Sequence, residues 1–177
     1  MKLSVIIAAL LSFLLLSCNS ETTLQKYFVE NSEKKGFIAL DISPSILNID
    51  KTKLTAEQKA ALESFDKMNI ITFQANDKNQ AQYDAESKKV TAILKGKTYQ
   101  ELMKVGSGKD GASISYVGDE NDIDEFVLFA KRKENGFAVV RILGNDMNPN
   151  NIMNMLSLLK NANVDMEQLK PLQSLIK

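Results

Sequence analysis

Residues 112–143, ASISYVGDENDIDEFVLFAKRKENGFAVVRIL, decide the fold of this chain. The stretch holds three segments rich in β-branched and aromatic residues, which favour β-strands. Short polar connections separate these segments, so we predict that neighbouring strands pair antiparallel, as a meander. The three predicted strands are residues 112–117, 125–131 and 137–143.

Upstream of the meander, the pattern predicts a strand, a helix and a second strand. Residues 37–42 and the β-branched run 70–73 predict the two strands. Between them, Thr55 and Gln58 form a capping-box pattern, which is typical of a helix start. The expected apolar face of that helix consists of Ala61, Leu62, Phe65 and Met68. This order of elements predicts a βαβ unit.

Further helices are expected before and after the meander in the sequence. The second capping-box pattern, Thr98–Glu101, predicts a helix that carries Leu102 and Met103. Asn148 followed by Pro149 is typical of another helix start. The remaining expected helices are residues 22–35, 84–96 and a last segment from Asp165 that packs on the sheet or frays. We predict an α+β fold, with an open, mostly antiparallel sheet of about five strands and helices packed mainly on one face.

The first eighteen residues predict export and lipid attachment. Lys2 is followed by an apolar run, Leu3 to Leu16, which as a helix is about 21 Å long and therefore short for a membrane span of roughly 30 Å. A basic start with a short apolar run is typical of a secretory signal. The following Leu15-Leu16-Ser17-Cys18 resembles the lipobox of bacterial lipoproteins, in which the cysteine is acylated by fatty acids such as palmitate.

The expected organisation follows from that resemblance. Residues 1–17 are the predicted lipoprotein signal peptide, and residues 18–177 are a single domain with its lipid anchor at Cys18. Asn19 stands where lipoproteins retained at the inner membrane commonly have Asp, so we expect the outer membrane. Surface-exposed lipoproteins usually carry an acidic run directly after the cysteine. Only Glu21 is acidic in the stretch directly after Cys18, which favours the periplasmic side over the cell surface.

Composition excludes several classes of function. The 22 basic and 22 acidic side chains balance, so nothing predicts nucleic-acid binding, which needs a basic surface. The sequence has no His, which removes Ser-His-Asp triads and His-ligated metal sites. Its single Cys excludes an intrachain disulfide and a CxxC motif. We expect no cofactor and no metal site.

Three short motifs have an ordinary interpretation. Gly106–Gly111 matches G-x-G-x-x-G, but a strand follows it where a dinucleotide fold needs a helix, so we expect a loop. The S-x-x-K pairs starting at Ser32 and Ser64 occur as often as chance predicts. The acidic cluster 119–125 lacks EF-hand spacing, and we expect a solvated hairpin loop. No catalytic residue is assigned.

The mature chain resembles the bacterial lipoprotein family called domain of unknown function 4252. The resemblance rests on the order of several segments, which are Tyr27-Phe28, residues 37–41, Tyr99 with Leu102-Met103, and residues 141–149. The family has no assigned activity, so the resemblance implies a cellular location and the extent of the domain, without a mechanism.

Three functions remain open from the sequence. We expect first a non-catalytic envelope lipoprotein that is held to the membrane by its anchor and binds a protein partner or supports an envelope assembly. The alternative is a periplasmic carrier of a small ligand or lipid. The third is a hydrolase that uses carboxylates or a Ser-Lys pair. An exposed apolar patch of several hundred Å² favours the first function, and an enclosed apolar pocket favours the second.

Overall fold

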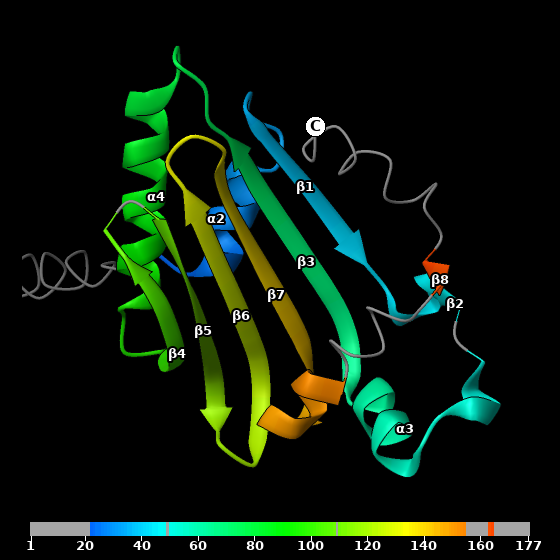
Figure 1. Cartoon of the computed structure of the whole chain (residues 1–177). Helices are drawn as coiled ribbons and strands as arrows, with labels where there is room; N and C mark the ends of the chain where they lie inside the picture. The colour runs from blue at the N-terminus through cyan, green and yellow to red at the C-terminus, as the bar shows by residue number, and fades with distance from the viewer. Residues whose placement is uncertain (1–21, 49, 109, 155–162, 165–177) are drawn as a thin grey trace, which may run out of the picture.

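A six-stranded open sheet forms the centre of the molecule (Figure 1). The structure is a computed structural model that describes residues 22–48, 50–108, 110–154 and 163–164. The strands run in the order β1-β3-β7-β6-β5-β4, and every neighbouring pair is antiparallel. They are β1 (Phe37–Ile42), β3 (Phe65–Gln74), β4 (Gln100–Ser107), β5 (Asp110–Asp119), β6 (Asp122–Arg132) and β7 (Gly136–Met147). The predicted α+β fold with an open antiparallel sheet is confirmed, with six strands where about five were expected.

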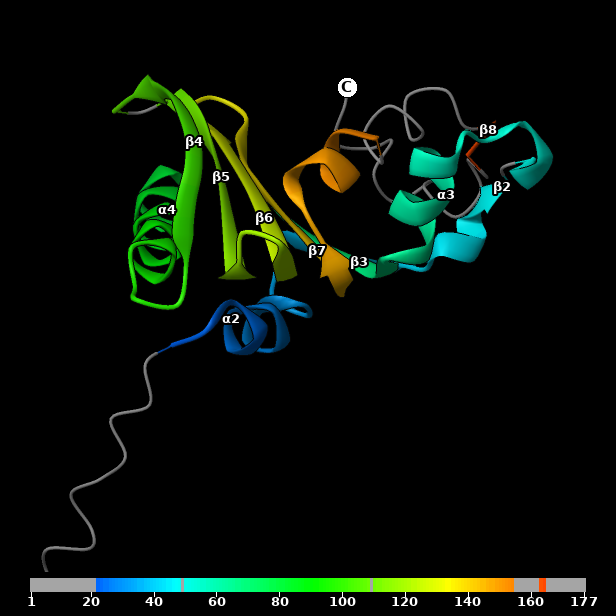
Figure 2. The ribbon, with the colours of Figure 1, turned by 90° about the horizontal axis from the view of Figure 1, so that it is seen from below.

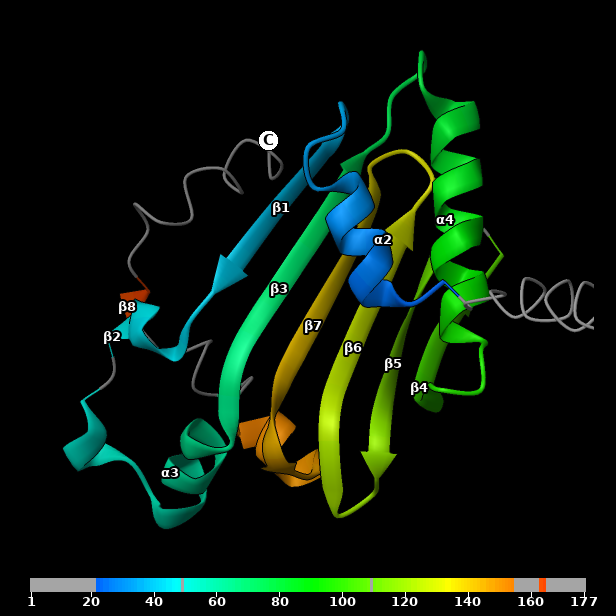
Figure 3. The same cartoon turned by 180° about the vertical axis from the view of Figure 1, so that it is seen from behind.

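Helices lie on both sides of the sheet and define two different faces. Helices α2 (Leu24–Asn31) and α4 (Gln80–Leu94) pack on one face, which we call the helix-covered face (Figure 3). Helix α3 (Ala56–Glu63) and the helix at 149–154 lie at one end of the opposite face, which we call the open face (Figure 2). Short elements complete the described chain: η2 (Pro44–Ile46), η3 (Lys51–Lys53), and β2 (Leu47–Asn48) paired with β8 (Asn163–Val164).

The predicted meander is confirmed as β5, β6 and β7. These strands pair through two short hairpins, and Gly136 at the second hairpin has φ +115°. A Cβ at Gly136 would lie 1.8 Å from the carbonyl oxygen of Phe73, so only glycine lets β7 approach β3 at this point. The meander therefore connects to β3 through β7, which places β3 inside the sheet and β1 at its edge.

The main core lies between the helix-covered face and its two helices. It is largely aromatic, and Phe73 stacks with Phe137 at a ring distance of 5.7 Å and meets Phe37 edge-on at 5.0 Å. Leu24 from α2 and Val90 from α4 are fully buried against these rings. A second, smaller core under α3 and the 149–154 helix joins Leu62, Phe65, Met68, Tyr116, Ile123, Phe126, Ile142, Met147 and Ile152.

The region 55–74 corrects one prediction. The capping box at Thr55 and Gln58 is present, but α3 ends at Glu63, and Phe65 and Met68 belong to β3. Met68 lies between Ile42 of β1 and Ile142 of β7, so strand pairing on both sides overrides the helical spacing of these residues. Because β1 and β3 are antiparallel neighbours, the predicted βαβ unit is wrong.

A second correction concerns the capping-box pattern Thr98–Glu101. Residues 100–107 form strand β4, so the predicted helix carrying Leu102 and Met103 is wrong. Strand β4 pairs with β5 along its whole length, with a bulge between Glu101 and Met103. The helix start at Asn148 is confirmed, because the backbone amide of Asn151 donates to the Asn148 side chain at 3.0 Å. The helix expected at 84–96 is present as α4, but it begins earlier, at Gln80, with Asn79 in the N-cap position. The expected segment from Asp165 lies outside the described residues.

Candidate functional site

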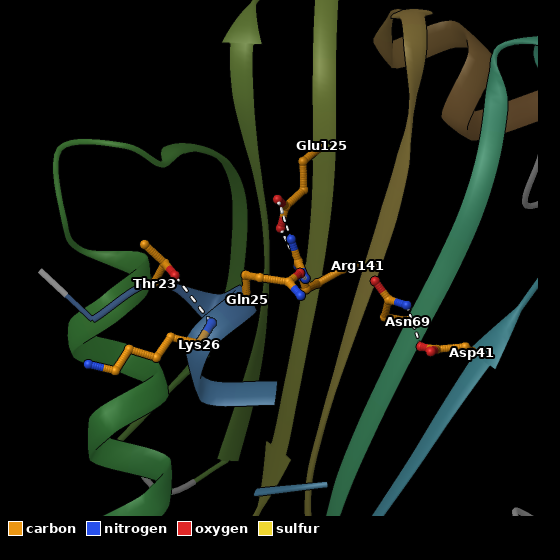
Figure 4. Close-up of polar contacts among 7 residues, drawn as sticks. All are labelled: Thr23, Gln25, Lys26, Asp41, Asn69, Glu125 and Arg141. Carbon is orange, nitrogen blue, oxygen red and sulfur yellow. Dashed lines mark hydrogen bonds and ion pairs between the residues drawn. The ribbon is translucent and has the colours of Figure 1, made fainter. Parts of the chain in front are cut away.

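The predicted lipidation site, Cys18, lies outside the described residues. The described chain begins at Thr22, and α2 starts two residues later with Thr23 as its N-cap, whose side chain accepts from the Lys26 amide at 3.2 Å (Figure 4). In the described part of the chain, no helix has the length and apolar character needed to cross a bilayer. Helix α2 thus begins six residues after Cys18.

Helix α2 is tied to the helix-covered face by a buried polar network. The Arg141 guanidinium on β7 donates to both carboxylate oxygens of Glu125 on β6, at 2.7 and 2.9 Å, and to the Gln25 side chain at 2.6 Å (Figure 4). Its side chain is only 5% exposed and also packs over the Phe28 ring at 5.5 Å. Nearby, Asn69 donates to Asp41. Arg141 therefore joins two strands and the first helix.

Two tyrosines extend this network. The Tyr27 hydroxyl donates to Glu86 of α4 at 3.0 Å, and burial together with the Glu86 charge raises the pKa of Tyr27 well above its usual range. Burial also raises the pKa of Tyr99, which has a backbone hydrogen bond with Leu24 at the start of α2. Since Lys89 also pairs with Glu86, at 2.7 Å, each of these buried charges has a partner. The network holds α2 in place and presents no unpaired reactive group.

The serines and glycines of the short sequence motifs have structural roles in helices and in a hairpin. The Ser32 and Ser64 hydroxyls donate to helix backbone carbonyls of Val29 and Ala61, at 3.3 and 3.0 Å. Gly106 and Gly108 have positive φ angles at the β4–β5 hairpin. The loop expected over Gly106–Gly111 is shorter than predicted, because Gly106 pairs with Gly111 and Ser107 pairs with Asp110 in the two strands.

The acidic cluster 119–125 is divided by the fold. Asp119 and Asp122 lie opposite each other at the exposed β5–β6 turn, as expected for a solvated hairpin loop, whereas Glu125 is buried and binds Arg141. No three Asp, Glu, His or Cys side chains of the described residues come together as a possible metal site.

The open face carries an apolar trough that runs across the strands. Val105, Ala112, Ala130 and Ala138 are neighbours in register on β4, β5, β6 and β7, and we call this row the trough floor. The row lines two hollows, of about 600 Å³ and about 300 Å³. Figure 1 shows α3 and the 149–154 helix at the lower end of this face, away from the β4–β5 and β6–β7 hairpins.

The two hollows have different surroundings. The smaller one is apolar, with Met103, Ile114, Leu128 and Val140 beside the trough floor. The larger one has a polar rim that includes Gln74, Asp110, Arg132 and Asn135. Thr72 continues the row of the floor onto β3, and its buried hydroxyl has no hydrogen-bond partner among the described residues. The trough is therefore an apolar surface with polar groups along one side.

Sequence reasoning found neither the trough nor the Arg141 network. A lone Arg in the apolar run 137–143 is a signal for a buried ion pair, because alternation places it beside Val139 on the covered side. The trough has a weaker signal, since its floor appears only when four strands are set in register.

The fold and these surfaces define an α+β domain with one packed face and one partly uncovered face. The family model described as domain of unknown function 4252 matches residues 27–155, and the chain belongs to that family. This confirms the family resemblance predicted from the sequence. No curated protein and no solved structure matches the chain.

Proposed function

We propose that this chain is a non-catalytic outer-membrane lipoprotein that binds an envelope protein through the open face of its sheet. The trough on that face is the observation that carries the proposal. Its edge residues Met103 and Val105 are more than half exposed, and Ala130 is exposed at its centre. Contiguous apolar surface of this kind is typical of protein interaction sites.

The shape of the trough favours a protein partner over a small-ligand carrier. Carrier sites are concave and bury most of the ligand surface. Both hollows lie on the surface of the sheet, and their shared floor includes the exposed Ala130. The carrier remains the second candidate because the hollow of about 300 Å³ is almost wholly apolar.

The lipid anchor rests on the sequence around Cys18, and the fold is compatible with it. Four residues in extended conformation span at most about 14 Å, so Thr22 is held within that distance of Cys18. Helix α2 follows directly and lies on the helix-covered face (Figure 3). An anchor at Cys18 therefore keeps the helix-covered side near the bilayer, and the open face lies on the other side of the sheet, available to a periplasmic partner.

The partner surface can be tested with two matched alanine substitutions. Ala130 in the trough and Ala81 on α4 are both exposed, so Ala130→Glu and Ala81→Glu add the same charge to opposite faces. After in-cell crosslinking of the full chain, we expect Ala130→Glu to abolish one reproducible crosslinked protein and Ala81→Glu to retain it. Both variants should melt within a few degrees of the natural chain, since exposed substitutions change stability by about 0.5 kcal/mol or less. Equal capture by both variants would contradict the proposed surface.

The anchor is tested separately at Cys18. Replacing Cys18 with Ala should abolish incorporation of labelled palmitate and leave the signal peptide uncleaved, because acylation and cleavage of a lipoprotein both depend on the cysteine. Labelling and gel mobility in whole cells measure both effects. Persistent labelling of the variant would refute the lipid anchor, whatever the outcome at Ala130.

A further inference from the structure

Strand β4 forms one edge of the sheet, and its outer edge has no strand partner among the described residues. It is the last strand in the order of the sheet, and β5 pairs with only one of its edges. Five large apolar side chains are exposed in the described chain, and three of them belong to β4: Leu102 at 47%, Met103 at 51% and Val105 at 54%. An exposed apolar edge strand offers backbone N–H and C=O groups for pairing with another chain.

The two sides of β4 differ in chemistry. Met103 lies opposite Ile114 and Val105 opposite Ala112, so both continue the apolar trough to the edge of the sheet. Lys104 lies opposite Ser113 and points to the other side, where it lines a hollow of about 240 Å³ together with Lys95 and Lys131.

This second side carries excess positive charge. Glu101 and Asp110 also line the hollow, so three basic and two acidic side chains meet there. The contact between Lys104 and Glu101 is long, at 3.9 Å, and both side chains are 56% exposed, which makes it a weak pair. Lys95 and Lys131 have no carboxylate within 4.0 Å in the described part of the chain. The edge therefore suits a segment that is apolar on one side and acidic on the other.

We propose that β4 binds an extended segment of the partner protein, which adds to the sheet as a further strand and alternates apolar and acidic residues. This inference rests on the proposed function and specifies the mode of binding. Backbone hydrogen bonds to β4 supply affinity, while alternate side chains supply specificity. The apolar side chains of the segment cover Met103 and Val105, and its acidic side chains face Lys104 and Lys95.

A second copy of this chain fits the edge less well. If two β4 strands paired antiparallel so that Met103 faced Val105 of the other copy, both apolar side chains would be covered. That register places Lys104 directly opposite Lys104 of the second copy, and like charges opposite each other are destabilising. The bulge at Glu101–Met103 further interrupts regular self-pairing. Charge complementarity thus favours a different, acidic partner segment.

The test uses photo-reactive amino acids in the full lipoprotein in its native cells. One is placed at Met103 on the edge, one at Arg132 on the rim of the trough, and one at Val29, which is exposed on α2. We expect Met103 and Arg132 to crosslink to the same protein and Val29 to give no such product. Mass spectrometry of the Met103 product should identify a partner peptide that alternates apolar and acidic residues.

Charge exchange then tests the register. Lys104→Glu should lower the Met103 crosslink at least tenfold, and Lys59→Glu, an exposed lysine on α3, should leave it unchanged. Changing the facing acidic residue of the partner segment to Lys should restore the crosslink to Lys104→Glu, which a misfolded variant would not allow.

Several results would overturn strand addition at β4. A crosslink from Arg132 without one from Met103 would exclude the edge and leave the proposed open-face function intact. Absence of both crosslinks would contradict the function as well. A Met103 product joined to a second copy, or to residues 165–177 of the same chain, would assign the edge to another occupant. An unchanged crosslink in Lys104→Glu would exclude the acidic segment.

Discussion

The two faces of the sheet use alternate residues of the same strands, yet they are packed very differently. On β6, Val127 faces α2 and α4 and is fully buried, whereas its neighbour Leu128 is half-buried on the open face and Ala130 is exposed. The covered face is built from interlocking aromatic rings, and the open face has alanines at its centre. The covered face is thus packed along the sheet, whereas the open face is packed only under α3 and the 149–154 helix and remains available for contact at the trough.

The difference in side-chain size explains why only one face carries the main helices. Phe37, Phe73, Phe129 and Phe137 fill the space under α2 and α4 with ring contacts of 5.0 to 6.3 Å. The trough floor of the open face offers little volume for a helix of this chain to pack against. A complementary surface can supply that volume. Its binding would bury apolar surface, and each Å² removed from water stabilises the complex by about 25 cal/mol.

The largest expected effect comes from the covered face. Phe73 is 1% exposed, so Phe73→Ala should lower the free energy of unfolding by about 3–5 kcal/mol through lost burial and a cavity. Its counterpart on the open face, Leu128→Ala, should cost less than about 2 kcal/mol, because Leu128 is only partly buried. Urea unfolding of both variants measures the difference. Equal losses would show that the open face is packed as tightly as the covered one.

The second prediction concerns the charge buried in the covered face. Arg141→Met leaves the Glu125 carboxylate buried without its partner and should cost about 3–5 kcal/mol. The double variant Arg141→Met with Glu125→Leu should recover most of that loss, since neither charge is then buried. Arg132→Met on the open side should change stability by about 0.5 kcal/mol or less. Thermal or urea unfolding measures all three, and a neutral Arg141→Met would exclude a structural role for the pair.

The smallest expected effect is that of Tyr27→Phe, which also has a pH signature. Loss of the hydrogen bond to Glu86 should cost about 1–3 kcal/mol at neutral pH. Because the folded pKa of Tyr27 is raised, its contribution is fully present below the unfolded pKa of about 10 and is lost as pH rises above it. The natural chain should therefore lose stability steeply above pH ~10, and Tyr27→Phe less steeply.

Other buried tyrosines also contribute to the loss of stability with rising pH. Tyr83 and Tyr99 also have pKa values raised by burial, so Tyr27→Phe should reduce the slope without removing it. Urea unfolding of both proteins between neutral pH and pH ~11 gives the comparison. Identical alkaline slopes for the two proteins would mean that Tyr27 ionises as readily in the folded state as in the unfolded one.

Local patterns predicted the fold where a strand or a helix start depends on neighbouring residues. The meander follows from the runs at 112–143, and the helix start at Asn148 and Pro149 from capping chemistry. The pattern at Thr98–Glu101 failed, because pairing with β5 outweighs a local capping preference. The prediction that Phe65 and Met68 belong to a helix was wrong for the same reason, because β3 pairs with β1 on one side and β7 on the other.

The candidate site was beyond sequence reasoning because it depends on register. Met103, Ala112 and Ala130 become one surface only after β4, β5 and β6 are aligned. A shift of one residue in any strand would move its residues to the other face. The lipidation site at Cys18 needs no such alignment, because a short contiguous motif carries it, and it stays a prediction.

The pairing of β3 with β7 has a consequence for how the chain acquires its structure. Phe65 lies opposite Gly144 and Gln74 opposite Gly136, so partners are 62 to 79 residues apart in the sequence. Contacts of such separation form slowly, because a long loop must close before they stabilise the chain. Because synthesis proceeds from the N-terminus, Leu24 and Phe73 have no complete core until Phe137 and Val139 have been added to the chain. Any chaperone that prevents aggregation of the growing chain must therefore protect α2, β1 and β3 until β7 has been synthesised.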